Sequence, residues 1–127
     1  SNDIWEERPI DLLIEDEQAL QKTVGERLSQ EGYEIISALD GEIGLNLASA
    51  KKPDLILLDL ILPKVQGLDV LKKLKETKET KETPVIILTN LEEMEKINKA
   101  LELGATAYLV KANYSLEELV EKIKNLI

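Results

Sequence analysis

The chain of 127 residues contains no cysteine and no histidine. Without cysteine it has no disulfides, no thiolate nucleophile and no cysteine-ligated zinc or iron–sulfur site. Without histidine it has no imidazole base, imidazole metal ligand or histidine phosphoryl donor. No apolar run approaches the ~20 residues of a membrane span, and the first residues lack a signal-peptide pattern. Any chemistry must therefore use carboxylates, Lys, Ser, Thr, Tyr and backbone groups.

Positive charge is also in short supply, because 16 Lys and Arg stand against 25 Asp and Glu, for a net charge of −9. A duplex-binding surface needs a basic footprint, so we expect no direct nucleic-acid binding by this domain. A hydrophobic share of 43% and a charged share of 32% are typical of a globular chain. We expect a single cytoplasmic domain, 1–127, with its core at about 9–127 and with 1–8 as an N-terminal extension or cloning scar.

Short apolar runs alternate with amphipathic stretches five times along the chain. The apolar runs predict strands at 10–14, 33–36, 55–58, 84–88 and 107–110. The amphipathic stretches predict helices over 18–30, 43–48, 68–74 and 91–101, and from 115 to the end. Five such units with short connections predict an α/β fold: a doubly wound, flavodoxin-like parallel sheet of five strands in the order 2-1-3-4-5, with five helices on two faces.

Local signals mark where several of these elements begin and end. Gly32 and Gly104 are expected to end helices, because glycine tolerates a positive φ. Asp40 and Ser115 are expected to cap the helices that follow them. The segment 75–83 repeats Lys-Glu-Thr three times, and we interpret it as a solvated helix end and loop.

Charged and hydroxyl side chains follow four of the five predicted strands. Glu15 and Asp16 follow the first strand, Asp59 the third, Thr89 the fourth and Lys111 the fifth. In the predicted order the first and third strands are neighbours, so three carboxylates converge, and they would repel one another unless a cation intervenes. Carboxylates with room for water suit Mg²⁺. The ammonium and the hydroxyl suit an incoming phosphoryl group, and a carboxylate can be its nucleophile.

Acidic residues at strand ends are also common simply because loops are solvated. We interpret Glu17 in this way, as a charge that favours the start of the following helix.

Several segments resemble the receiver domain of two-component response regulators. They are Leu-Leu-Ile-Glu-Asp-Glu at 12–17, Leu-Leu-Asp-Leu-Ile-Leu-Pro at 57–63, Gly67, Ile-Leu-Thr at 87–89 and Tyr-Leu-Val-Lys at 108–111. The resemblance covers nearly the whole chain in the family's order. No single segment is specific to this family, but the combination of segments is a strong indication of it.

The resemblance implies that Asp59 is the phosphoacceptor, which takes a phosphoryl group from a histidine kinase or a histidine phosphotransfer protein. It implies that Glu15, Asp16 and Asp59 hold Mg²⁺, with the backbone carbonyl of Ile61 as a further ligand. Such a domain is not an enzyme in the usual sense, because it catalyses only its own phosphorylation and slow dephosphorylation.

The resemblance also implies a switch. Thr89 and Lys111 would contact the phosphoryl group, and Tyr108 would turn inward when Thr89 moves. Alternatively, Tyr108 is an ordinary strand aromatic that packs beside the fourth helix. The switched surface would be that of the fourth helix, fifth strand and fifth helix, which is a candidate surface for a partner or a homodimer.

The sequence departs from the family pattern at several positions. Ala112 follows the lysine in place of the usual proline, so the Lys111–Ala112 bond is expected to be trans and the loop through Asn113 and Tyr114 re-routed. Asn90 replaces a small residue and is expected to narrow access to Asp59.

Two apolar residues occupy positions that influence hydrolysis in this family. Ile61 and Leu91 cannot orient an attacking water, so we expect a long-lived phospho-aspartate.

Other functions fit less well. A dehalogenase-type phosphatase would need an acid at Ile61, a flavodoxin-like carrier would need a phosphate loop in place of Glu15 to Glu17, and the dinucleotide-binding Gly-x-Gly-x-x-Gly is missing. The remaining alternative is a degenerate receiver that acts as a phosphorylation-independent protein-interaction module.

Overall fold

Five parallel strands form one sheet in the order β2-β1-β3-β4-β5 in the computed structural model, which describes residues 8–113 and 115–127. The strands are β1 (Ile10–Ile14), β2 (Glu34–Ala38), β3 (Leu55–Asp59), β4 (Val85–Thr89) and β5 (Ala107–Val110). The helices are α2 (Gln18–Gln30), α3 (Gly41–Lys51), α4 (Gly67–Glu76), the 3₁₀ helix η1 (Leu91–Lys96), α5 (Ile97–Glu102) and α6 (Leu116–Lys124). The predicted fold class and strand order are confirmed, whereas the greater part of the expected N-terminal extension lies outside the described residues.

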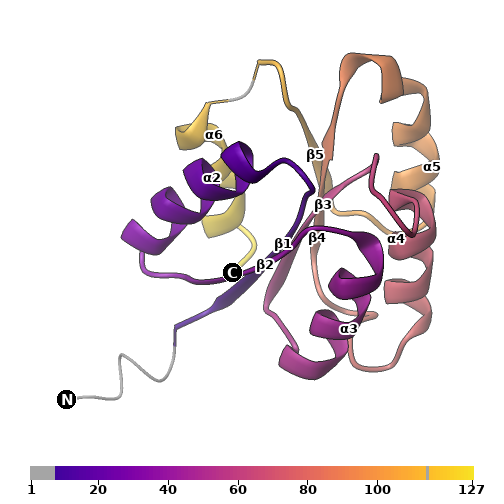
Figure 1. Cartoon of the computed structure of the whole chain (residues 1–127), viewed down its shortest axis with the longest axis horizontal. Coiled ribbons are helices and arrows are strands. Elements are labelled where there is room, and N and C mark those ends of the chain that lie inside the picture. The colour runs from indigo at the N-terminus through magenta and orange to yellow at the C-terminus, as the bar shows by residue number, and fades with distance from the viewer. Residues whose placement is uncertain (1–7, 114) are drawn as a thin grey trace.

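The sheet is covered on both faces (Figure 1). Helices α2 and α6 pack on one face, in a cluster that includes Leu13, Leu57 and Leu119. Helices α3, α4 and α5 pack on the other, in a cluster that includes Leu12 and Leu71. Strand β3 is buried along its whole length, as its unbroken apolar run predicts. Within the described residues, none of these helices combines the length and the apolar character that a bilayer crossing requires.

Several element boundaries differ from the prediction by a few residues, and two of the differences have a clear local cause. Strand β2 begins at Glu34 rather than Tyr33, because the Tyr33 amide donates to the Leu28 carbonyl and closes the end of α2. The helix predicted over 91–101 is present, but only its second part is an α-helix, because its first part is the 3₁₀ helix η1. The amide of Glu93 donates to the carbonyl three residues back, and 3₁₀ turns of this kind are frequent at helix starts.

The predicted helix caps and stops are confirmed. Asp40 accepts a hydrogen bond from the Ile43 amide at 2.8 Å, and Ser115 accepts one from the Glu118 amide at 3.1 Å. Gly32 and Gly104 have φ angles of 99° and 109°, which explains why glycine follows these helices.

The Lys-Glu-Thr repeat at 75–83 is only partly a solvated loop. Its middle threonine, Thr80, is 1% exposed and donates to the Leu74 carbonyl at 2.7 Å. The ammonium of Lys75 folds back and donates to the Thr83 carbonyl at 2.7 Å. The prediction of a solvated loop is therefore wrong for Thr80, which ties the loop back to the end of α4.

Candidate functional site

The sheet register brings charged residues from three strands to one edge. Strand β1 pairs in parallel with β3 so that Glu15, which follows β1, lies at the level of Asp59. Strand β5 pairs with β4 so that Lys111 comes one residue beyond Thr89, and its amide donates to the Thr89 carbonyl at 2.8 Å. The convergence expected at the carboxyl edge of the sheet is therefore a consequence of the pairing.

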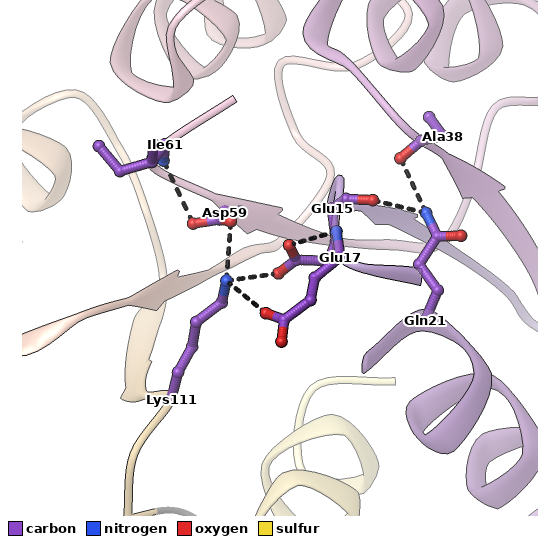
Figure 2. A network of polar contacts seen from close by, with 7 residues as sticks. All are labelled: Glu15, Glu17, Gln21, Ala38, Asp59, Ile61 and Lys111. Atoms are coloured by element: carbon purple, nitrogen blue, oxygen red, sulfur yellow. Dashed lines mark hydrogen bonds and ion pairs between the residues drawn. The ribbon is translucent and has the colours of Figure 1, made fainter. Parts of the chain in front are cut away.

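The ammonium of Lys111 lies at the centre of this cluster (Figure 2). Its Nζ is 2.7 Å from Glu15 Oε1, 2.8 Å from Asp59 Oδ2 and 3.7 Å from Glu17 Oε1. The side chains of Glu15 and Asp59 are almost fully buried, at 0% and 3% exposure. Two buried carboxylates at this spacing need a cation, and Lys111 supplies it.

Glu15, Asp16 and Asp59 form a group that is able to hold a metal ion. One carboxylate oxygen from each lies within 4.8 Å of the others. Glu15 and Asp59 are buried while Asp16 is exposed, so the group opens to solvent on one side. An all-oxygen donor set with access for water fits Mg²⁺, which keeps part of its hydration shell. The Ile61 amide donates to Asp59 Oδ1 at 3.2 Å, which orients that carboxylate.

Burial and Lys111 act in opposite directions on the pKa of Glu15. Burial raises the pKa of Glu15, the hydrogen bond from Lys111 opposes the rise, and the negative charge of Asp59 adds to it. For Lys111, burial by itself would lower the pKa, but the hydrogen bonds to Asp59 and Glu15 outweigh it and raise the pKa to about 12. The lysine is therefore charged at any physiological pH.

Thr89 ends β4 at this edge of the sheet, whereas Tyr108 lies within β5 opposite Ile87, and neither residue joins the cluster. Thr89 is buried, and its hydroxyl donates to the Asn90 carbonyl at 3.1 Å. Tyr108 is 38% exposed and lines an open hollow together with Leu101 of α5. Within the described residues, neither hydroxyl has a polar contact with the group of Glu15 and Asp59.

Gln21 has a role at this site that was not predicted from the sequence. Its amide nitrogen donates to the Glu15 carbonyl at 2.7 Å and to the Ala38 carbonyl at 3.0 Å, so it ties the ends of β1 and β2 together (Figure 2). A signal for this role exists, because Gln21 lies three residues before the buried Val24 and shares its helix face. A polar side chain on a buried face needs a partner.

Glu17 also has more contacts than its position at a helix start predicts. It is the N-cap of α2, but its side chain makes no capping hydrogen bond. Its carboxylate turns instead toward Lys111, and its amide donates to Glu15 Oε2 at 3.0 Å. Glu17 is therefore part of the charged cluster and more than a solvated helix end.

The substitution of alanine after the lysine does not pull Lys111 away from the site. The Lys111–Ala112 peptide bond is trans, as predicted, since the described residues contain no cis bond. The lysine still reaches Asp59. The predictions that involve Tyr114 and the side chain of Leu91 lie outside the described part of the structure.

Comparison with known proteins gives consistent matches. The chain matches the family model of the response regulator receiver domain over residues 12–124. It is 38% identical to the alkaline phosphatase synthesis transcriptional regulatory protein PhoP of Bacillus subtilis, over 91% of this chain and 47% of that protein. It is 29% identical to sporulation initiation phosphotransferase F of the same organism, over 91% of both.

The structure agrees with these matches. The chemotaxis response regulator CheY4 of Vibrio cholerae superposes with a TM-score of 0.87 at 28% identity, covering 94% of this chain and 99% of that one. The chain spans about half the length of PhoP and of several similar transcriptional regulators, and most of the length of phosphotransferase F. Because the family model covers nearly all of the folded part, the chain belongs to the receiver domain family of response regulators, which serve two-component signalling.

Proposed function

We propose that Asp59 accepts a phosphoryl group from the phosphohistidine of a histidine kinase or of a histidine phosphotransfer protein. A carboxylate oxygen of Asp59 forms the new P–O bond while the P–N bond to the imidazole breaks. The imidazole keeps the electron pair and takes up a proton from solvent. The observation that carries the proposal is the position of Asp59, which shares its site with two further acids and has the Lys111 ammonium 2.8 Å from one of its oxygens.

Glu15, Asp16 and Asp59 would hold Mg²⁺, with the carbonyl of Ile61 as a further ligand. The oxygen donor set and the exposed side at Asp16 support this assignment. When bound, the ion supplies positive charge against the oxygens of the phosphoryl group.

Lys111 and Thr89 would recognise the charge that phosphorylation adds. Lys111 already contacts the acceptor carboxylate, so it needs only a small movement to pair with a phosphoryl oxygen. The Thr89 hydroxyl would exchange its bond to the Asn90 carbonyl for one to the phosphoryl group. Because Thr89 directly precedes the turn into η1, its movement would bias η1 and α5.

The output surface would consist of η1, α5, β5 and α6. An open hollow of about 560 Å³ lies on it and includes Leu101, Tyr108, Asn113, Glu118 and Lys122 in its lining. Tyr108 would turn inward upon phosphorylation and reshape this hollow. The surface would serve a partner protein or a homodimer in the cytoplasm. We expect no nucleic-acid contact by this domain because of its net charge of −9.

The alternative of a receiver that signals by docking alone is less well supported. Ala112 and Asn90 favour it, yet Lys111 reaches both Glu15 and Asp59 although alanine follows the lysine. The buried placement of these acids also has a stability cost that a docking module would not need.

Intact mass spectrometry tests the proposal. The protein is incubated with Mg²⁺ and either acetyl phosphate or phosphoramidate, whose P–N bond resembles that of phosphohistidine. We expect a gain of one phosphoryl group, which disappears in Asp59→Asn and with EDTA. Asp69→Asn is the matched control, because this aspartate is exposed in the first turn of α4. No gain from either donor, or an equal gain in Asp59→Asn, would contradict the proposal.

A further inference from the structure

We propose that Glu17 is a positioning residue for Lys111: its carboxylate receives the lysine ammonium when a divalent cation occupies the group of Glu15, Asp16 and Asp59. This inference rests on the metal site of the proposed function. It concerns a residue whose sequence position suggests only a favourable charge at a helix start.

The geometry shows a conflict between two cations. Two of the three carboxylates that contact the Lys111 ammonium, those of Glu15 and Asp59, belong to the group that is able to hold a metal. A divalent ion on these oxygens would stand close to the ammonium, and like charges at such a distance repel strongly in a buried site. Lys111 must therefore give up part of its contacts when the ion binds.

Glu17 is the acid that remains for the lysine. Its Oε1 is 3.7 Å from Lys111 Nζ, and it is not a member of the metal-capable group (Figure 2). A small movement of the ammonium away from Glu15 would bring it into close contact with Glu17. The lysine would then keep a counter-ion throughout metal binding.

The backbone holds Glu17 in the right place for this exchange. Its amide donates to Glu15 Oε2 at 3.0 Å, which couples the loop to the cluster. Its side chain is 62% exposed and makes no capping bond to α2, so the carboxylate is free to follow the lysine. Its contribution is that of an exposed ion pair, and we expect its removal to weaken Mg²⁺ binding about two- to fivefold.

A double-mutant cycle on Mg²⁺ affinity tests this role without any phosphorylation step. Isothermal titration calorimetry with MgCl₂ is carried out on the wild type, Glu17→Gln, Lys111→Met and the double variant. If Glu17 acts through Lys111, the loss of affinity caused by Glu17→Gln disappears when the lysine is absent. Glu42→Gln is the charge control, because this exposed acid begins α3 at the same edge of the sheet.

The outcomes separate the possible roles of Glu17. Equal losses from Glu17→Gln in both backgrounds, or a loss no larger than that of Glu42→Gln, would show a general charge effect and overturn the inference. That result would leave the phosphoacceptor proposal intact. An absence of Mg²⁺ binding in the wild type would instead overturn the metal assignment and the role of Glu17 with it.

A second measurement covers the case in which Lys111→Met does not fold. The side-chain ¹⁵N resonance of Lys111 is followed by NMR during a Mg²⁺ titration of the wild type and of Glu17→Gln. We expect the ammonium signal to stay protected from solvent exchange in the metal-bound wild type and to broaden in the variant. Identical behaviour in both proteins would contradict the inference.

Discussion

Strand β1 has a fully buried acid near each end, and only one of the two acids has a cation beside it among the described residues. Glu15 follows the carboxyl end and has the Lys111 ammonium at 2.7 Å. Asp11 lies near the amino end, on the face covered by α2 and α6, and neither of its oxygens has a hydrogen-bond partner within the described residues. The charge that most affects Asp11 is the like charge of Asp54.

The two acids differ in whether a cation lies beside them, and not in the direction in which their pKa values shift. Burial is the main cause that raises the pKa of both acids. At Glu15 the hydrogen bond from Lys111 opposes the shift, and the pKa is still raised to about 7. At Asp11 burial and then the charge of Asp54 raise the pKa to about 7, and no cation among the described residues counters the rise. Each end of the strand therefore has a buried acid, but only the acid beside Lys111 belongs to the group that is able to hold a metal.

The largest expected effect concerns Asp11, the buried acid near the amino end of β1. The folded-state pKa of Asp11 is raised from 3.8 to about 7, so its contribution to stability is fully present below pH 3.8 and is lost as the pH rises to about 7. Asp11→Asn removes this titration, and we expect it to raise the free energy of unfolding by up to about 4 kcal/mol at pH 8.

Urea denaturation of Asp11→Asn and the wild type at pH 5 and pH 8 measures this effect. The advantage of the variant must grow between the two pH values. An advantage that does not change with pH, or a loss of stability at pH 8, would show that Asp11 is ionised and paired in the folded protein.

The next effect concerns Lys111, the cation at the carboxyl end of β1. Lys111→Met leaves Glu15 and Asp59 buried without a counter-ion, and we expect the free energy of unfolding to fall by about 3 kcal/mol in EDTA. Saturating Mg²⁺ would restore stability, by about 2.7 kcal/mol at a hundred times its Kd. Because the ammonium no longer competes, the recovery should be larger than the Mg²⁺ effect on the wild type when both proteins are compared at the same Mg²⁺ concentration.

Lys124→Met is the matched control for this prediction. Lys124 also forms an ion pair, at 2.9 Å with Glu31, but its side chain is 54% exposed. We expect Lys124→Met to cause a much smaller loss than Lys111→Met, as is usual for an exposed ion pair, without any dependence on Mg²⁺. Equal losses in the two variants, in denaturation curves with and without the ion, would refute the difference between the two lysines.

The smallest expected effect concerns the backbone beside the group that is able to hold a metal. Gln21→Met keeps the length of the side chain but removes its two hydrogen bonds to the Glu15 and Ala38 carbonyls. We expect a loss of about 1 kcal/mol in the free energy of unfolding, because both carbonyls can turn to water at the loop. Hydrogen exchange of the Glu17 amide, whose acceptor is Glu15, should accelerate. Unchanged exchange would show that Gln21 does not hold this loop.

The fold was largely predictable from local patterns. The unbroken apolar run of β3 marked a central strand, and the caps at Asp40 and Ser115 marked helix starts. Two predictions failed because a local pattern is compatible with more than one structure. Segment 91–101 has helical periodicity, but periodicity does not distinguish a 3₁₀ start from an α-helix. The repeat at 75–83 has a solvated composition, yet Thr80 is buried by its contact with the end of α4.

Local sequence patterns are enough to show which chemical groups lie at the strand ends and in what order the strands and helices follow one another. Motifs at the ends of apolar runs also indicate the family. How these groups pair follows from the three-dimensional arrangement alone. Lys111 contacts Glu15 and Glu17 from the far end of the chain, and the Asp11 carboxylate has no hydrogen-bond partner among the described residues. Such pairings depend on sheet register and side-chain reach, which local sequence patterns do not encode.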